Sequence, residues 1–449
     1  MRIQNKRAGV GRVARHAMML AVLVVAPACK GILDVPNPQA FGNDALNNSV
    51  ILKTVTDGSE GLLHLAFDDY IVATELLADN MTSTSTWIDW EDIAFGRLRH
   101  DWATAGTFSG TQDQLLRARF AAQSAAERVQ LVLGTAASSS ALRAQVLAVD
   151  AIADLLLGMG YCESPLASGT ARAPDSEVFK QAVTKFTAAI AAAQAISGDA
   201  AARTKWTAVG YAGRARANLL AGNYAAAGSD AAQVPAGFVY NAIYAEGAAS
   251  TQSWTGNQFN QNRNRSGGLR EMYQSRVHVI DSTSSYEAYL RDWSDPTRDD
   301  PRMAVMRTAN QLGVNNRIPY YGITKYASRS APIRMFSSVE ATLIQAEVAM
   351  RASDFTTEAN LLNGLRARTG VALPPMAVPA SAAAGQAALL NERMAELFVE
   401  GHRLQDLDRF NLTGALLGPG RATKLPLSRT EILANPSMKD GGGSCPRIS

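Results

Sequence analysis

Apolar side chains recur every three to four residues over several long stretches of the chain, which is the spacing of one buried face of an α-helix. This pattern predicts long helices at residues 59–81, 111–133, 139–159, 176–196 and 201–221. Glycine and serine runs separate neighbouring stretches, so the helices are expected to pack as hairpins. The pattern therefore predicts an all-α fold.

Residues 176–227 resemble a tetratricopeptide-type helical hairpin. Small residues surround Ala217 and allow two helices to approach closely, Gly222 and Asn223 turn the chain, and Tyr224 is expected to pack back into the hairpin. A second copy is predicted at residues 339–368, with a turn at residues 352–355. Such hairpins bury one another's apolar faces, so they are expected to form a stacked scaffold.

Between about residues 235 and 331 the helical period disappears. This stretch is rich in Asn, Gln, Ser, Gly, Arg and aromatic residues. It is therefore predicted to be a long irregular loop insertion on the helical scaffold, the kind of segment that tends to carry function.

The first 28 residues have the organisation of a signal peptide. Five Lys and Arg side chains precede a short apolar run at residues 17–26, which is too short to span a bilayer as a helix. The sequence Ala26-Pro27-Ala28-Cys29 resembles a bacterial lipobox, which predicts acylation of Cys29. The alternative is an ordinary signal peptidase cleavage before a plain cysteine. Residues 29–42 are predicted to form the lipid anchor and an extended tether.

Charge and cysteine content change once this segment is removed. The full chain has 43 Lys and Arg against 40 Asp and Glu, and five of the basic residues precede Cys29, so the mature chain carries a net charge of −2. This balance gives no support to nucleic-acid binding, which requires a basic surface. Cys162 and Cys445 remain; an exported chain permits a disulfide between them, and two unrelated thiols are the alternative.

The sequence contains few of the patterns that catalysis or metal binding requires. The mature chain has four histidines, with no H-x-x-x-H or C-x-x-C spacing and no glycine-rich nucleotide loop, so neither a metal nor a cofactor is predicted. Two groups of carboxylates invite a glycosidase interpretation. These are Glu392, Glu396 and Glu400, and Asp299 with Asp300; ion pairing and turn formation explain both groups better.

Residues 390–410, which we call the signature segment, read LNERMAELFVEGHRLQDLDRF. They closely resemble the signature helix of the SusD/RagB family, roughly E-R-x-x-E-L-x-x-E-G-H-R-x-x-D-L-x-R. The positions that match are Glu392, Arg393, Glu396, Leu397, Glu400, Gly401, His402, Arg403, Asp406, Leu407 and Arg409. One departure is Gln405, where an aromatic residue is common. We expect the segment to form one helix, on which the three glutamates share a face and the arginines can pair with them or with Asp406.

Other motifs agree with this resemblance. Asp300-Pro301-Arg302 resembles the D-P-R element of the family. Residues 334–350 resemble one of its helices, and residues 363–368 resemble its N-x-x-R-x-R motif. The resemblance predicts a SusD-like domain at residues 43–436, while the tail at residues 437–449 is atypical.

Membership of the SusD/RagB family would imply a non-enzymatic role. The implied protein is a lipid-anchored, surface-exposed component of the outer membrane that binds nutrients, most simply glycans. A SusC-like TonB-dependent transporter is the implied partner. Two alternatives stay open, a helical-repeat scaffold that binds only proteins and a surface glycosidase.

Candidate ligand-binding residues come from two regions. Sugar rings stack on aromatic side chains, and their hydroxyl groups bond to polar ones. The early loop supplies Asp79, Asn80, Trp87 and Trp90, and the insertion supplies Trp254, Asn257, Phe259, Tyr273 and Trp293. The resemblance points to the same two regions, because family members that bind glycans use aromatic side chains from an early loop and from the middle insertion.

Overall fold

The computed structural model describes most of the chain, namely residues 43–98, 111–245, 267–269, 277–280, 300–306, 310–326 and 328–438. The chain divides into two units, Met1–Asn47 and Asn48–Ser449. Of the first unit, only the end is described, with the short 3-10 helix η1 (Asn43–Leu46). All that follows concerns the second unit.

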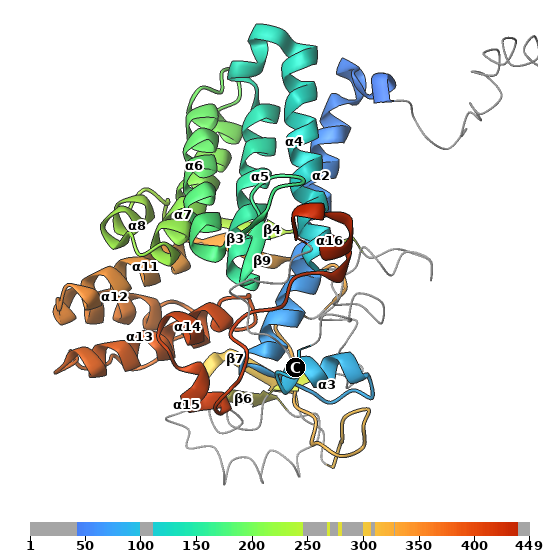
Figure 1. Cartoon of the computed structure of the whole chain (residues 1–449). Helices are drawn as coiled ribbons and strands as arrows, with labels where there is room; N and C mark the ends of the chain where they lie inside the picture. Colours follow the sequence, from blue (N-terminus) through green and yellow to red (C-terminus); the bar gives the residue numbers. More distant parts are fainter. Residues whose placement is uncertain are drawn as a thin grey trace, which may run out of the picture. The chain divides into compact units, whose positions relative to one another are not determined.

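The scaffold of this unit is a series of helices in which each packs against the next (Figure 1). In chain order they are α2 (Ser49–Leu77), α4 (Thr111–Leu133), α5 (Ala141–Gly160), α6 (Asp175–Gln194), α7 (Ala200–Leu220), α8 (Tyr224–Ala231), α11 (Ser338–Arg351) and α12 (Phe355–Arg366). The 3-10 helix η3 (Gly134–Ser139) joins α4 to α5. The predicted all-α class and the predicted helices are confirmed, with α2 beginning ten residues earlier than expected, at Ser49 instead of residue 59.

Close approach of the helices depends on small side chains. A Cβ atom on Gly213 of α7 would overlap the ring of Phe186 in α6, so only glycine lets these two helices pack at this distance. Both predicted hairpin copies are present, at α6–α7–α8 and at α11–α12. Side-chain caps fix where the helices of the second copy begin, since Ser337 accepts from the backbone of Glu340 and Asp354 accepts from that of Thr357.

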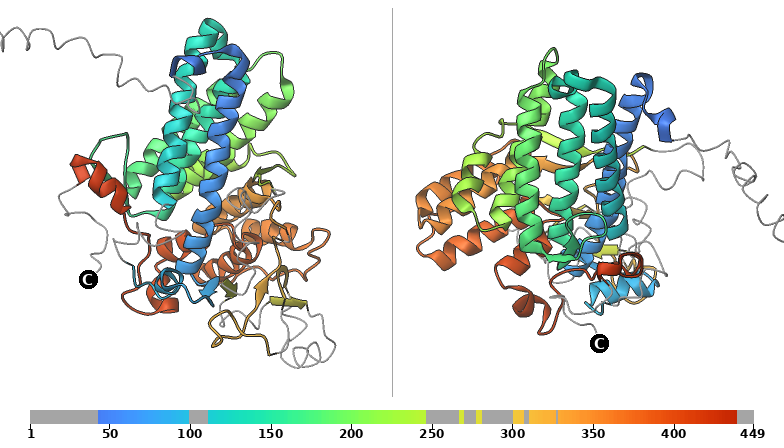
Figure 2. Two further views of the ribbon diagram at one scale, coloured as in Figure 1. Left: turned by 90° about the vertical axis from the view of Figure 1, so that its right-hand side faces the viewer. Right: turned by 45° about the horizontal axis from the view of Figure 1, so that its top comes forward.

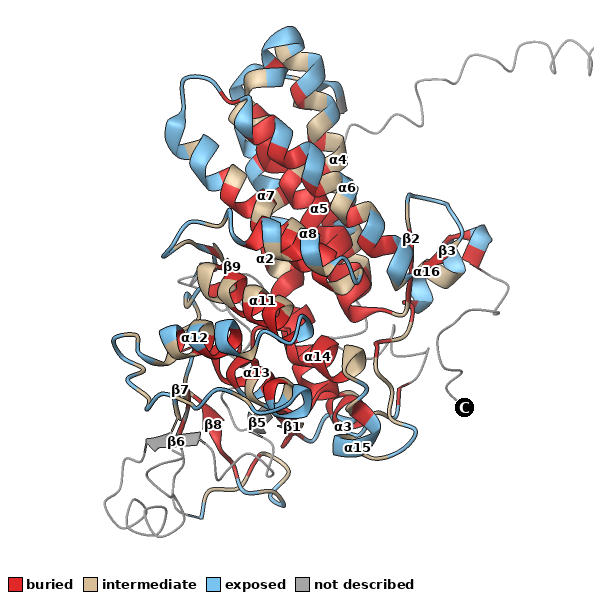
Figure 3. Ribbon diagram, turned by 90° about the vertical axis from the view of Figure 1, so that its left-hand side faces the viewer, coloured by how far each residue is buried: buried red, intermediate tan, exposed pale blue. Residues whose placement is uncertain are grey.

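Apolar burial is concentrated along α2, α5 and α6, drawn in red in Figure 3. In the second half of α2 almost every side chain is buried, including Phe67, Ile71 and Leu76, each no more than 1% exposed. Neighbouring elements cover this part of the helix on all sides. Among the described residues, no helix combines the length and the apolar character that a membrane span requires.

Short helices complete the C-terminal part. They are α13 (Ala382–Glu396), α14 (Arg403–Arg409), α15 (Thr413–Leu417), α16 (Arg429–Ala434) and the 3-10 helix η6 (Pro436–Met438). Early in the chain, the short α3 (Ile88–Ala94) follows α2.

The signature segment is not one helix, and the expectation that its three glutamates share a helical face was wrong for Glu400. Helix α13 ends at Glu396, and Val399 (φ +50°) and Gly401 (φ +79°) then turn the backbone before α14 begins. The turn is held in place because the buried carboxylate of Glu75 accepts the N–H of Gly401 at 2.8 Å. Helical hydrogen bonding cannot continue through this left-handed conformation.

The strands form four small sheets, and three of the sheets contain strands from the insertion. The pairs are β1 (Met81–Ser83) with β5 (Gly267–Leu269), β2 (Glu163–Pro165) with β3 (Arg172–Pro174), and β4 (Val239–Ala242) with β9 (Ile333–Ser337), while β6 (Val277–Ile280), β7 (Asp300–Met306) and β8 (Gly322–Ile323) form a three-stranded sheet. Strands β4 to β8 all lie within residues 235–331. The insertion is therefore tied to the scaffold by short strands, which are too brief for a period of two to be visible in the sequence.

Candidate functional site

The early loop forms a surface around α3, at the end of α2 (Figure 1). Strand β1 leads into residues 84–87, where the hydroxyl of Ser85 accepts the N–H of Trp87 at 3.0 Å. Trp87 thereby stands at the N-cap of α3, and Asp89 and Glu91 occupy the first helical turn. Two views of this region, in which α3 lies at the lower edge of the molecule, are given in Figure 2.

The two tryptophans of this loop have different environments. Trp87 is 51% exposed, whereas Trp90 is 1% exposed. Their ring centroids lie 5.6 Å apart with an interplanar angle of 73°, so the buried ring supports the exposed one edge to face. Trp87 is thus a fixed aromatic platform that a ligand can reach, and Trp90 is its support.

Other exposed side chains extend this platform. Ile88 is 69% exposed and Phe95 is 45% exposed, and the guanidinium of Arg97 lies 5.1 Å from the ring centroid of Phe95. Arg97 also donates to Asp92 at 2.8 Å. We call this set (Trp87, Ile88, Phe95 and Arg97) the α3 surface. It offers apolar side chains beside the guanidinium donors of Arg97, a combination that suits sugar recognition.

Asp79 and Asn80 lie in the interior of the molecule. The carboxylate of Asp79 is fully buried and accepts two hydrogen bonds from Arg403, at 2.6 and 2.7 Å. Asn80 is 1% exposed and donates to Glu75 at 2.6 Å. Burial raises the pKa of Glu75 to about 7, although the N–H of Gly401 and the amide of Asn80 act in the opposite direction. Asp79 and Asn80 were predicted to contact a ligand, but they form hydrogen bonds inside the molecule. A ligand in solution does not reach them in this conformation.

The insertion is joined directly to the early loop. Strands β1 and β5 pair antiparallel, with Met81 opposite Leu269 and Ser83 opposite Gly267. A second contact comes from residues 310–320, where the N–H of Asn315 donates to the carbonyl of Thr84 at 3.0 Å. The two regions that the sequence singles out are thus hydrogen-bonded to each other.

The candidate ligand residues of the insertion lie outside the described residues. These are Trp254, Asn257, Phe259, Tyr273 and Trp293. The strand that precedes them, β4, and the strand that interrupts them, β5, are described. Their part in ligand binding stays a prediction.

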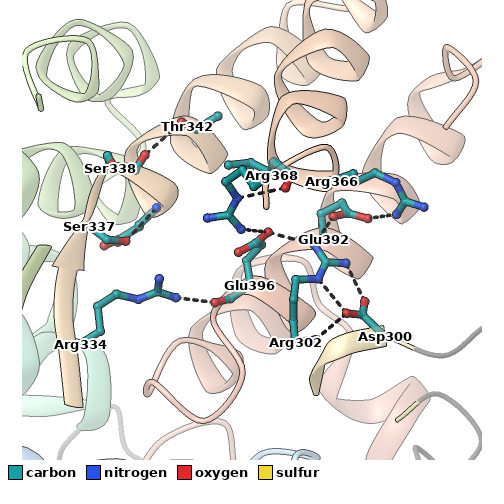
Figure 4. Close-up of polar contacts among 12 residues, drawn as sticks. Asp300, Arg302, Arg334, Ser337, Ser338, Thr342, Arg366, Arg368, Glu392 and Glu396 are labelled. Carbon is teal, nitrogen blue, oxygen red and sulfur yellow. Dashed lines mark hydrogen bonds and ion pairs between the residues drawn. The ribbon is translucent and has the colours of Figure 1, made fainter. Parts of the chain in front are cut away.

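The glutamates of α13 are the centre of an ion-pair network (Figure 4). Arg302 of β7 donates to Glu392 at 2.6 Å and to Glu396 at 3.0 Å, and Asp300 holds the same guanidinium at 2.6 Å. Arg366 at the end of α12 also contacts Glu392, and Arg368, just beyond α12, contacts Glu396. The D-P-R element and the signature segment, distant in sequence, are therefore parts of one network.

A second group of ion pairs surrounds α14. The buried carboxylate of Asp406 accepts from Arg393 at 2.9 Å and from Arg409 at 2.8 Å. Burial by itself would raise the pKa of Asp406, but the two guanidinium groups outweigh burial and lower it. Arg409 also contacts Glu347 of α11, which Arg351 joins at 2.8 Å. This group fastens the signature segment to the second hairpin copy.

The carboxylates that suggested a glycosidase are thus engaged with cations. Glu392 and Glu396 bind the arginines named above, and Glu400 is bound by Arg334 at 2.8 Å and by Lys325 at 2.5 Å. All three glutamates are at most 5% exposed, which supports a structural role. Of the acidic pair Asp299 and Asp300, only Asp300 is described.

Cysteines and metals add little to the site. Cys162 is disulfide-bonded, and its Sγ lies 3.8 Å from the carbonyl oxygen of Leu425. Both other cysteines, Cys29 and Cys445, lie outside the described residues, so the Cys162–Cys445 pairing and the lipid attachment stay predictions. Within the described ranges, no group of three or more His, Cys, Asp or Glu side chains is placed to hold a metal ion.

Comparison with known proteins adds a family to this description. Residues 240–439 match the model of the SusD family. This part of the chain is therefore similar to the SusD family. It covers the signature segment, the D-P-R element and most of the insertion. No protein of curated annotation matches the chain in sequence.

Solved structures with a similar fold cover a larger share of the chain than the family model does. A SusD superfamily protein from Bacteroides thetaiotaomicron VPI-5482 has a TM-score of 0.60 at 16% identity, over 87% of this chain and 97% of that one. A SusD-like carbohydrate-binding protein from Bacteroides vulgatus ATCC 8482 has a TM-score of 0.59 at 16% identity, over 80% and 83%. A laminarin-binding SusD-like protein has a TM-score of 0.57 at 14% identity, over 86% and 98%. At these identities the structures establish the SusD-like fold.

Proposed function

We propose that this chain captures glycans at the outer membrane and delivers them to a SusC-like TonB-dependent transporter, without breaking a bond itself. The observation that carries the proposal is the pairing of β1 with β5, because it joins the loop of the exposed Trp87 to the insertion. The similarity of residues 240–439 to the SusD family supports carbohydrate as the ligand class. Two solved structures of the same fold are described as binding carbohydrate or laminarin, which agrees with this choice.

The α3 surface is the proposed capture site. A sugar ring would stack on Trp87, whose orientation is fixed by Trp90 and by the hydrogen bond to Ser85. Aromatic residues of the insertion (Trp254, Phe259, Tyr273 and Trp293) are proposed to complete the site. A rigid platform reduces the entropy cost of ligand ordering, which suits a protein that must bind and then release.

The first experiment is a calorimetric titration of the purified chain against a panel of polysaccharides and peptides. We expect at least one glycan to bind, and Trp87→Ala to weaken that binding by about tenfold or more, because the stacking surface is lost. Trp87→Phe should retain much of the affinity, since an aromatic face remains. Leu131→Ala is the matched control, because Leu131 is a comparably exposed apolar residue (68%) on α4.

Each result decides between the candidate functions. Glycan binding that is unchanged in Trp87→Ala would place the site elsewhere. Hydrolysis of a bound glycan would favour the glycosidase alternative, and binding to no member of the panel would favour a scaffold that recognises only proteins.

Anchoring is tested separately. Cys29→Ala should move the chain from the outer-membrane fraction to the soluble fraction and remove metabolic labelling by a fatty acid, because the acylated side chain is gone. Copurification of a TonB-dependent transporter with the wild-type chain from detergent-solubilised outer membranes would support the proposed partner. A Cys29→Ala chain that stays membrane-bound would contradict the predicted anchor.

A further inference from the structure

A groove of about 640 Å³ lies on the side of the scaffold, between α4, α16 and the turn that joins β2 to β3. Its α4 wall carries Arg117 and Phe120, and Leu62 of α2 continues the same wall. Ser168 of the β2–β3 turn and Thr430 of α16 face it from the other side. The volume is within the usual range for a small-molecule site.

The opposite wall is held in place by its two ends. The N–H of Ser428, just before α16, donates to Gln112 of α4 at 2.6 Å. Beyond α16, the amide of Asn435 donates to the carbonyl of Thr170 at 2.9 Å. The hydroxyl of Ser437 donates to the carbonyl of Gly169 at 3.0 Å. Figure 3 shows α16 beside β2 and β3 accordingly. The groove is therefore defined by fixed elements of the fold.

Hydrogen-bonding capacity in the walls is left unused by the chain itself. The side chains of Arg117, Ser168 and Thr430 make no hydrogen bond or ion pair within the described part of the chain. The guanidinium supplies donors only, and each hydroxyl can both donate and accept. Phe120, by contrast, is 66% exposed although it is a large apolar ring. An aromatic face thus lines one cavity together with free polar groups, of which Arg117 lies on the same wall and Ser168 and Thr430 lie on the opposite one.

We propose that this groove is a second carbohydrate-binding site, which holds a short oligosaccharide against Phe120. The apolar C–H face of a sugar ring packs on the phenyl ring, and its hydroxyl groups bond to the polar wall. A purely apolar ligand would leave Arg117 and the hydroxyls unsatisfied, at a cost in binding free energy. The inference rests on the proposed function only for the class of ligand, since the groove is built by different residues.

An extended peptide fits these walls less well. Pro165 and Pro436 both line the groove and have no backbone N–H, so they cannot donate to an added strand. Recognition there has to come from side chains, as it does for sugars.

The groove is distinct from the α3 surface. Leu62 precedes the end of α2 at Leu77 by 15 residues, which is roughly 22 Å along the helix axis. α3 lies beyond that end, so an oligosaccharide on Phe120 and one on Trp87 occupy separate places.

The test is amide hydrogen exchange of the full chain during titration with short oligosaccharides. Binding in the groove is read from amide exchange in residues 428–438, which include α16, a helix with no buried side chain. Binding at the α3 surface is read from amide exchange in residues 81–97. We expect saccharide to slow exchange in residues 428–438. Phe120→Ala should raise the saccharide concentration needed for that protection about tenfold and leave residues 81–97 unaffected. Trp87→Ala should raise the saccharide concentration needed to protect residues 81–97 and leave the protection of residues 428–438 unaffected.

The outcomes separate this inference from the proposed function. Protection of residues 81–97 alone, with every saccharide, overturns the second site and leaves the capture site intact. Protection of residues 428–438 that is unchanged in Phe120→Ala also overturns it, because the ring is then no contact. Leu131→Ala, on the same helix and 68% exposed, is the matched control and should behave as the wild type. A chain in which neither region is protected contradicts both proposals.

Discussion

The signature segment and the α3 surface contrast two ways in which charged and aromatic residues are used. In the signature segment, Glu392, Arg393 and Asp406 are at most 4% exposed, and each is bound by a group of opposite charge. On the α3 surface, Trp87 is half-exposed and its ring lies against that of Trp90. The most recognisable motif of the chain is therefore structural, and the proposed chemistry lies where the pattern is weakest.

The physical cause of this contrast is burial. A buried charge is tolerated only with a partner in good geometry, so a network of them fixes both residue type and position. The choice of an exposed aromatic residue is set mainly by the ligand that it contacts, so the residue types around it can vary. The contrast can be tested by variants in each region, taken here from the largest expected effect to the smallest.

Arg403→Leu should have the largest effect. It leaves the carboxylate of Asp79 fully buried without its two hydrogen bonds, which is expected to cost about 3–5 kcal/mol of folding free energy. Chemical denaturation measures this. Asp79→Asn combined with Arg403→Leu should recover part of the loss, because no charge remains buried. A loss below about 1 kcal/mol in the single variant would contradict the structural role of the segment.

Gly313→Ala should act on the link between the two regions. An added Cβ would lie 2.8 Å from the carbonyl oxygen of Thr84, so the loop at residues 310–320 must shift away from the α3 surface. We expect a loss of about 1–3 kcal/mol in stability and weaker glycan binding. Gly364→Ala is the control, since it lies in α12 with nothing within 4 Å of the added atom. Unchanged affinity in Gly313→Ala would show that the insertion does not shape the capture site.

Glu358→Gln should have a smaller and pH-dependent effect. Glu358 of α12 is buried and accepts no hydrogen bond within the described residues, and burial raises its pKa to about 7. Because the folded pKa is raised, the native state binds the proton more tightly, and this group's contribution to stability falls between about pH 4.5 and pH 7. The variant should be more stable than the wild type at pH 8 by about 1 kcal/mol and similar to it at pH 4. Thermal unfolding of both proteins between pH 4 and pH 8 measures this difference in stability. An equal difference at pH 4 and pH 8 would contradict a raised pKa for Glu358.

Trp87→Ala should have the smallest effect on stability. The side chain is half-exposed, so we expect a change within about 0.5 kcal/mol, together with the loss of glycan affinity described above. A large loss of stability would mean that Trp87 belongs to the structural group, and the contrast between the two regions would fail.

Much of the fold could be predicted because the apolar spacing of a helix is visible in a short stretch of sequence. The apolar period predicted a helix at residues 111–133, which are the bounds of α4, and a degenerate hairpin pattern predicted α11 and α12. The break at Gly401 was not predicted, because the signature segment has good helical spacing throughout. The turn that follows the helix is held by a contact with Glu75, more than 300 residues earlier in the chain.

The candidate site could be predicted only in part, for a related reason. Trp87 and Asp79 lie in the same polar stretch, and sequence spacing gave no means to tell an exposed ring from a carboxylate that Arg403 buries. The groove at Phe120 was missed entirely, since in sequence this residue is one apolar position among many in α4. No signal in the sequence marks a cavity whose walls come from residues 62, 117–120, 168 and 430.

The sequence by itself determined the helices, the hairpin copies and the resemblance to the SusD family, because periodicity and motif spacing are properties of neighbouring residues. Tertiary structure alone decided which side chains are reachable: the β1–β5 pair, the partners of Glu392 and Asp79, and the walls of the groove. Burial and ion pairing depend on what the rest of the chain brings to a residue. That information is distributed over the whole fold and is absent from any one segment.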